Sequence, residues 1–190
     1  MLPRLHSPAM NPPGPPIRLG PDDAVRYVRA RQGLLLHEWQ SAGTPEGAHT
    51  ITPASIAGLL ADHRSATFGI EASPGAELIA IATITRTDYP RYAHRARLVS
   101  VYVEPRHRGR GVGETIVSAA VGVARGWRGV EFVDLCVSEH AAPAQRLYRR
   151  LGFVEWGRQA EATDYLGRRF DDIHMSLRLN NRGDDRQDAW

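Results

Sequence analysis

The residues best suited to chemistry form a short loop in the middle of the chain, Arg108-Gly109-Arg110-Gly111-Val112-Gly113. Glycine has no Cβ, so alternating glycines permit a tight turn and let a ligand approach the backbone closely. A helix is expected to begin at Gly113, and its first N–H groups and the positive end of its dipole would point to the same place. Backbone groups arranged in this way bind anions such as a pyrophosphate.

Spacing excludes two common kinds of phosphate loop. A P-loop needs Gly-x-x-x-x-Gly-Lys-Ser/Thr, and this chain contains no lysine. A dinucleotide fingerprint needs Gly-x-Gly-x-x-Gly, but the position of the third glycine falls on Glu114 or Ile116. The pattern that remains is Arg108-x-x-Gly111-x-Gly113, directly after an apolar strand.

The elements around the loop must position it. An apolar strand is predicted from about Ala96 to Glu104, a helix from Gly113 to Ala124, and a second strand from about Val130 to Val137. A strand, a crossover helix and a strand make a βαβ unit, so the two strands should be parallel. The helix is expected to turn four apolar residues inward: Ile116, Val117, Ala120 and Ala124.

Other patterns predict elements on both sides of this unit. Pro21 is expected to open a helix with Val25, Val28, Gln32 and Leu35 on its inner face. Thr52 is expected to cap a second helix from Pro53, with Ile56, Leu59 and Leu60 on one side. The remaining predictions are an antiparallel hairpin of Thr67 to Ala72 and Leu78 to Thr87, a helix from Pro143 to Leu151, and strands near Val154 to Ala160 and Phe170 to Leu179.

Three segments beyond the loop resemble one known family. Leu98 to Pro105 is similar to its fourth strand, and Leu135-Cys136-Val137 is similar to its fifth. Ala144 to Phe153 matches an Ala-x-x-Leu-Tyr-x-x-x-Gly-Phe motif. Together with a Gln/Arg-x-x-Gly-x-Gly/Ala loop, these segments resemble the GNAT (GCN5-related N-acetyltransferase) family. The resemblance is specific over residues 98 to 153.

The resemblance implies a fold and a cofactor. The fold is an α/β fold, in which a central, mostly antiparallel sheet has splayed parallel strands 4 and 5 and is flanked by helices. The cofactor is acetyl-CoA. The backbone of Val101, Tyr102 and Val103 would pair with its pantetheine arm, and the amides of Gly109, Arg110, Gly111, Val112, Gly113 and Glu114 would hold its pyrophosphate. The side chains of Arg108 and Arg110 would reach phosphates or solvent.

The resemblance also implies a reaction, the transfer of an acetyl group to a primary amine. Direct attack of the amine on the thioester passes through a tetrahedral intermediate, and a backbone N–H near Val101 to Val103 would stabilise its oxyanion. Tyr148 is the expected general acid, because a phenol with a pKa of about 10 can protonate a thiolate whose acid has a pKa of about 8.5. The alternative is that Tyr148 only packs under the cofactor.

Two aspects of the active site stay open. The family often has Asn four residues after the valine of its fifth strand, whereas this chain has Ala141, so one side-chain contact is expected to be lost. The general base that neutralises the amine is unassigned among Glu104, Glu38, His37 and Tyr102.

The acceptor, a small molecule or a peptide with an amine, is expected to dock on the variable parts of the family. These correspond to about Leu34 to Thr52 and Arg158 to Arg169, whose aromatic and acidic residues are Trp39, Glu46, Asp164 and Tyr165. Dimers are frequent in the family, so a homodimer is a further expectation.

Length and composition predict one domain. The chain has 190 residues, of which 42% are hydrophobic and 24% charged, as in soluble globular proteins. Six prolines in residues 1–16 predict a disordered tail, and residues 180–190 predict a polar one, which leaves a domain at residues 17–179. The beginning of the chain lacks an apolar signal stretch, and no apolar run is long enough to span a bilayer, so a cytoplasmic location is expected.

Charge and cysteine usage argue against other partners. All 24 basic residues are arginine, and they are spread along the chain among 21 acidic residues, for a net charge of +3. Nucleic-acid binding needs arginines clustered on one face, so no nucleic-acid partner is expected. A single cysteine, Cys136, excludes a disulfide or a multi-cysteine zinc site, and the histidines lack ligand spacing, so no metal is expected. Cys136 is predicted to be a buried strand residue.

Two other functions remain open at this point. Ala141 makes a non-catalytic acyl-CoA sensor conceivable, because the fold could bind the cofactor without turning it over. Arg106 to Arg110 is a short Arg/Gly segment that could bind RNA, in which case the affinity would fall steeply with salt.

Overall fold

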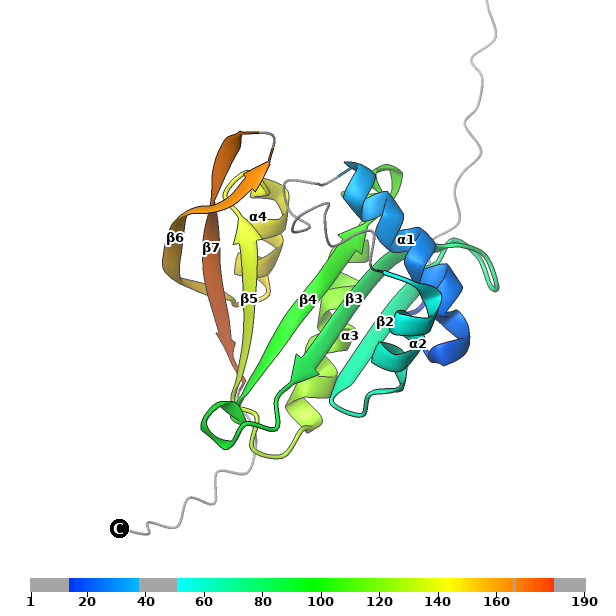
Figure 1. Ribbon diagram of the computed structural model, residues 1–190, viewed down its shortest axis with the longest axis horizontal. Helices are drawn as coiled ribbons and strands as arrows, with labels where there is room; N and C mark the ends of the chain where they lie inside the picture. Colours follow the sequence, from blue (N-terminus) through cyan, green and yellow to red (C-terminus); the bar gives the residue numbers. More distant parts are fainter. Residues whose placement is uncertain (1–13, 38–50, 166, 180–190) are drawn as a thin grey trace, which may run out of the picture.

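The computed structural model of the protein describes residues 14–37, 51–165 and 167–179 (Figure 1). The two predicted tails lie outside the described residues, apart from residues 14–16. In the described part of the chain, seven strands form one sheet in the order β1-β2-β3-β4-β5-β7-β6. The strands are β1 (Ile17–Arg18), β2 (Ser65–Glu71), β3 (Leu78–Arg86), β4 (Arg95–Val103), β5 (Phe132–Ser138), β6 (Val154–Tyr165) and β7 (Arg168–Arg178).

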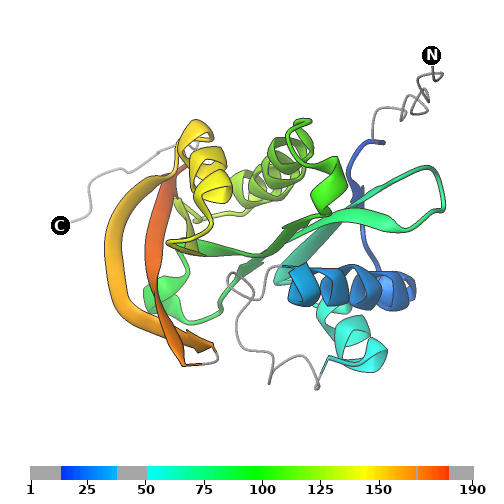
Figure 2. The same ribbon diagram turned by 90° about the horizontal axis from the view of Figure 1, so that it is seen from above.

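Helices cover both faces of this sheet. The α-helices are α1 (Ala24–His37), α2 (Pro53–Ala61), α3 (Val112–Gly126) and α4 (Ala142–Arg150), and short 3-10 turns are η1 (Pro21–Asp23), η3 (Pro90–Tyr92) and η4 (Pro105–His107). Figure 2 shows α1 and α2 on one face and α3 and α4 on the other. β4 and β5 are parallel, and the other neighbouring strands are antiparallel. This mixed α/β architecture confirms the predicted fold class.

Helix α3 is formed as the pattern predicts. Ile116, Val117, Ala120 and Ala124 are fully buried in the larger core cluster, between the helix and the sheet. The helix begins at Val112, one residue earlier than expected, because Gly111 is the N-cap residue. Thr52 also caps α2 as predicted, since its hydroxyl accepts a hydrogen bond from the Ser55 N–H at 3.2 Å.

The predicted inner face of α1 is wrong at two of its four positions. Val28 does pack against the smaller core cluster, and the side chain of Leu35 lies outside the described residues. Val25 is 48% exposed and Gln32 is exposed, whereas the buried residues are Ala24, Tyr27 and Ala30. These three residues recur every three positions, so they form one stripe of the helix. Two small alanines let the helix approach the sheet, and the large ring of Tyr27 fills the space between them. Aliphatic residues alone are therefore a poor guide to the packed face of this helix.

The predicted burial of Cys136 is also wrong. Alternation along β5 places Val133, Leu135 and Val137 in the core beneath α3 and α4, so Cys136 points to the opposite face, where it is exposed. The described helices on that face, α1 and α2, lie over the β1–β4 half of the sheet (Figure 2). Partial burial of the thiol and the neighbouring Asp172 carboxylate raise the pKa of Cys136 to about 12, so the thiol is protonated at neutral pH.

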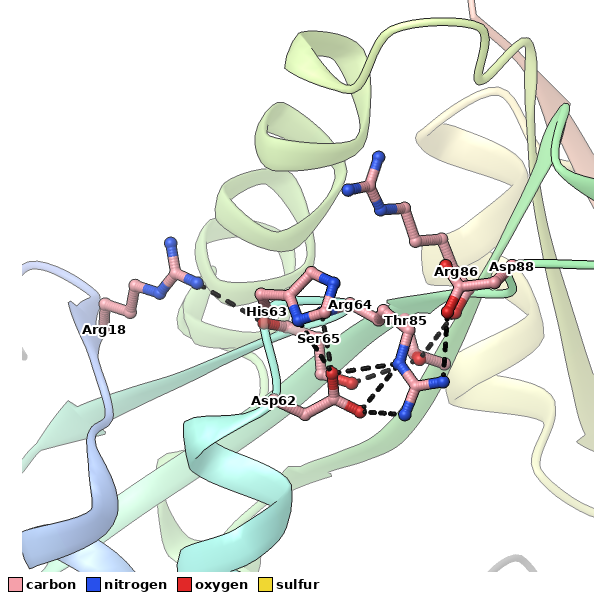
Figure 3. A network of polar contacts seen from close by, with 8 residues as sticks. All are labelled: Arg18, Asp62, His63, Arg64, Ser65, Thr85, Arg86 and Asp88. Carbon is pink, nitrogen blue, oxygen red and sulfur yellow. Dashed lines mark hydrogen bonds and ion pairs between the residues drawn. The ribbon is translucent and has the colours of Figure 1, made fainter.

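A polar network joins the end of α2 to the start of β2 and the end of β3 (Figure 3). The Arg64 guanidinium donates to Asp62, just after α2, at 2.8 Å and to Asp88, after β3, at 3.2 Å. Hydrogen bonds from the Arg64 side chain and from its backbone N–H lower the pKa of Asp62 to about 2. The Ser65 hydroxyl donates to Thr85 Oγ1 at 3.1 Å, across β2 and β3. Because these residues lie at the start of β2 and the end of β3, the network is structural.

A second ion pair attaches α1 to the sheet. Arg26 pairs with Glu71 on β2 and also donates to the Ala76 carbonyl at 2.7 Å. The Glu71 carboxylate accepts a further hydrogen bond from the Gly75 N–H at 3.0 Å. Hydrogen bonds from Arg26 and Gly75 hold the pKa of Glu71 below its ordinary value.

Glu71→Gln should therefore lower the free energy of unfolding by about 1 kcal/mol at neutral pH. The folded-state pKa is depressed, so the stabilisation is present above the unfolded-state pKa of about 4.3 and is lost as the pH falls through the folded-state pKa. Urea unfolding of both proteins at neutral and at acid pH measures this. Glu77→Gln is the matched control, because its ion pair with Arg29 is exposed and should contribute little. An equal loss at both pH values would contradict the prediction.

Candidate active site

A gap between β4 and β5 is the central feature of the site. The two strands pair through Arg95↔Phe132, Ala96↔Val133 and Arg97↔Asp134, and the ladder ends there although both strands continue. Figure 1 shows them diverging toward their carboxyl ends, as predicted for splayed parallel strands. In open α/β sheets, the carboxyl ends of parallel strands are where ligands bind.

The narrow end of this gap is held by an ion pair. Arg95 on β4 donates from Nε and Nη2 to the two carboxylate oxygens of Asp134 on β5, both at 2.6 Å. The Ser176 hydroxyl on β7 donates to the same carboxylate at 2.7 Å. A bidentate guanidinium–carboxylate pair has a fixed geometry. The strands are therefore fastened at one end and open at the other.

A β-bulge lies on β4 beside the gap. Thr83 on β3 pairs with Val99 and Ile81 pairs with Tyr102, so two residues of β4, Ser100 and Val101, oppose one residue of β3. Ser100 has φ 54°, in the left-handed region that a residue with a side chain seldom adopts. Because of the extra residue, side chains that would point to one face of the sheet without the bulge point to the other face after it. The bulge therefore determines which backbone groups of residues 101–103 face the gap.

The glycine loop joins β4 to α3 at the open end of the gap. Gly109 has φ 72° and Gly111 has φ 80°, so both require the left-handed conformation that glycine adopts without cost. Arg108 Nε donates to the Val103 carbonyl at 2.9 Å, which fastens the loop to the end of β4. An added Cβ at Gly113 would lie 3.0 Å from Leu147 Cδ2, so this glycine permits close packing of α3 against α4.

Tyr148 lies on the other side of the gap, in α4. It is 6% exposed and belongs to the core cluster that contains Val112 and Val137. Its ring contacts Phe153 edge-on, with centroids 5.8 Å apart. The predicted catalytic tyrosine is thus a buried core residue of α4, the helix that follows β5 along the chain.

Sequence reasoning missed Gln145, which fixes the position of α4. Its amide Nε2 is buried and donates to the Ser138 carbonyl at 3.0 Å and to the Glu139 carbonyl at 2.9 Å, at the end of β5. Gln145 lies one turn before Tyr148, so these bonds orient the turn that carries the tyrosine. A buried polar residue inside the helix motif was the signal that could have identified it.

A family model described as the acetyltransferase (GNAT) family matches residues 34–153. The chain belongs to the GNAT family. In Bacillus subtilis (strain 168), "Putative phosphinothricin acetyltransferase YwnH" is 30% identical over 82 residues, which are 43% of this chain and 49% of that protein. The match therefore spans about half the length of this relative.

Solved structures of GNAT proteins have the same fold. A GNAT acetyltransferase from Streptococcus pneumoniae superposes with a TM-score of 0.75 at 19% identity, over 86% of this chain and 98% of that chain. A structure described as "yncA, a putative ACETYLTRANSFERASE from Salmonella typhimurium with its cofactor Acetyl-CoA" superposes with a TM-score of 0.74 at 18% identity, over 88% of this chain and 95% of that chain. At this level of identity the likeness concerns the fold.

The general-base candidates of this GNAT chain differ in their surroundings. Glu104 pairs with Arg106 at 2.7 Å and lies 3.5 Å from His107 Nε2, so its carboxylate is already engaged. Tyr102 is buried in the smaller core cluster beneath α1. Glu38 and the side chain of His37 lie outside the described residues. Of the two described candidates, neither is an evident base.

The predicted acceptor residues fall mostly outside the described part of the chain, which omits Trp39, Glu46 and the side chain of Tyr165. Asp164 is described, at the β6–β7 hairpin, where its carboxylate accepts a hydrogen bond from the Gly167 N–H at 3.1 Å and lies 3.5 Å from Arg169 Nε. These contacts shape the hairpin turn.

Three further observations concern the described residues. At Ala141, the backbone N–H donates to the Ser138 carbonyl at 3.0 Å, and no side chain caps α4. Among the described residues, no group of three or more His, Cys, Asp and Glu side chains is placed to hold a metal ion. No described helix is both long and apolar enough to cross a membrane.

Proposed function

We propose that the chain is an acetyl-CoA-dependent N-acetyltransferase that acts on a primary amine of a small molecule or a peptide. The observation that carries the proposal is the β4–β5 gap, which has a bulged strand on one side and is followed by a glycine loop at a helix N-terminus. A buried tyrosine lies on α4, the helix that follows β5. These are the parts that thioester binding, oxyanion stabilisation and protonation of a leaving thiolate require.

The residues of the loop suit the cofactor. The N-terminus of α3 and the two left-handed glycines direct backbone N–H groups to one place, which suits a pyrophosphate. Gly109, Arg110, Gly111, Val112, Gly113 and Glu114 would provide these amides, and Arg108 and Arg110 add positive charge. The backbone of Val101, Tyr102 and Val103 borders the gap and would pair with the pantetheine arm.

The chemistry divides between the cofactor and the chain. Acetyl-CoA supplies a thioester, whose carbonyl carbon forms a bond to the amine nitrogen and whose carbon–sulfur bond then breaks. A backbone N–H of residues 101–103 would donate to the carbonyl oxygen while it carries negative charge. The Tyr148 hydroxyl would donate its proton to the departing sulfur. The amine loses a proton to a base that remains unassigned.

The extent and setting of the activity are part of the same proposal. The catalytic domain would span residues 17–179, from β1 through β7. The proposed location is the cytoplasm, and a homodimer is the proposed assembly. Nucleic acid and membrane are not among the proposed partners.

A thiol-release assay tests this function. Acetyl-CoA is incubated with the protein and a panel of amines: phosphinothricin, for which the B. subtilis relative is named, free amino acids, polyamines and peptides with free N-termini. Release of CoA that depends on both protein and amine would support the proposal. Tight acetyl-CoA binding without turnover on any amine would favour the sensor function. RNA binding that CoA does not compete with would favour the Arg/Gly alternative.

A further inference from the structure

The bulge residue Ser100 is held from the opposite side of the sheet. Arg31, in the middle of α1, donates from Nη1 to the Ser100 hydroxyl at 2.9 Å. The two residues are 69 positions apart in the sequence, and the contact crosses from a helix to the central strand of the site. A hydrogen bond from a charged donor is stronger than one between neutral groups.

Ser100 needs such support because of its backbone conformation. At φ 54° the Cβ of a non-glycine residue crowds its own backbone, so the left-handed state is disfavoured unless the surroundings stabilise it. If the backbone of Ser100 relaxed to an extended conformation, the bulge would be lost. The side chains of β4 after Ser100 would then point to the opposite faces of the sheet. Before the bulge, Ala96 and Leu98 lie in the core beneath α3, and after it Val101 and Val103 pack there. The bulge therefore sets the orientation of the backbone beside the gap.

We propose that Arg31 is a positioning residue for acetyl transfer, which holds Ser100 in the left-handed bulge and so orients the backbone of residues 101–103 toward the thioester. This rests on the proposed function, since it assigns that backbone to the cofactor and the oxyanion. Arg31 acts through Ser100 rather than on the reacting atoms.

Kinetics of variants at the two positions test the proposal. Arg31→Gln should lower kcat about tenfold with less than about a threefold change in KM for acetyl-CoA, because the glycine loop still holds the pyrophosphate. Ser100→Ala removes the hydroxyl and keeps Cβ, so it should cause a similar loss. Ser100→Gly also removes the hydroxyl but has no Cβ, so kcat should fall less than about threefold.

The combination of the two changes is decisive. In the Ser100→Gly background, Arg31→Gln should lower kcat by less than about twofold, because glycine needs no support in this conformation. If Arg31→Gln lowers kcat by the same tenfold in that background, Arg31 acts elsewhere, for example on the acceptor, and the proposal is overturned. Arg29→Gln is the matched control, since it removes one arginine of the same helix, whose pair with Glu77 is exposed.

A measurement without turnover separates this proposal from the proposed function. Hydrogen exchange of the amides of residues 100–103 should be faster in Arg31→Gln than in Arg29→Gln, in the absence of any amine. Faster exchange in a protein that acetylates no amine would leave the Arg31–Ser100 contact supported and the enzymatic function refuted. Unchanged exchange would overturn the role of Arg31, whatever the activity.

Discussion

Tyr148→Phe is expected to lower kcat about 100-fold and to change KM for acetyl-CoA by less than about threefold. A positioned general acid contributes about 100-fold or more to a rate, and phenylalanine lacks the hydroxyl that would protonate the departing thiolate. Phenylalanine keeps the ring, and with it the edge-on contact to Phe153 at 5.8 Å. The loss should therefore affect the chemical step rather than the fold. Steady-state kinetics with varied acetyl-CoA measure both constants.

The control for this variant is a second buried tyrosine. Tyr27 is 1% exposed beneath α1, in the core cluster on the other face of the sheet. Tyr27→Phe removes a buried hydroxyl in the same way and should keep kcat within about twofold. Equal activity of Tyr148→Phe and the wild type would show that the phenol of Tyr148 only packs under the cofactor.

Gly111→Val is expected to raise the dissociation constant of acetyl-CoA about 30-fold. Gly111 has φ 80° as the N-cap of α3, a conformation that costs a β-branched residue about 2 kcal/mol. An added Cβ would meet no atom within 4 Å, so the cost arises from the backbone rather than from crowding. Relaxation of the loop would turn its amides away from the pyrophosphate. Calorimetric titration with CoA and acetyl-CoA measures the effect.

Gly122→Val is the matched control for Gly111→Val. Gly122 is exposed in the middle of α3, and an added Cβ there also meets nothing within 4 Å. It has no left-handed φ, so valine should be accommodated and the affinity for acetyl-CoA retained. If both variants bind equally well, the loop is not the site of the pyrophosphate.

Local patterns were sufficient for much of the fold. The four inward residues of α3 and the cap of α2 were predicted, and the start of α3 was predicted to within one residue, because each depends on residues close by along the chain. The splayed parallel strands came from the family resemblance and are confirmed by the short β4–β5 ladder. The packed face of α1 was predicted only in part, because the choice between Val25 and Tyr27 depends on the shape of the sheet beneath the helix.

The candidate site, like the fold, could be predicted from the sequence only in part. The sequence by itself predicted the glycine loop and a helix start at Gly113, one residue after the observed start, because both depend on neighbouring residues. Its motifs also singled out Tyr148. Only the tertiary structure decided what orients these groups: Gln145 on the carbonyls that end β5, and Arg31 on the bulge at Ser100. Both are contacts between different elements, and one spans 69 positions. Because the Arg31–Ser100 pair forms only when the sheet and helices assemble, no local pattern in the chain predicts it.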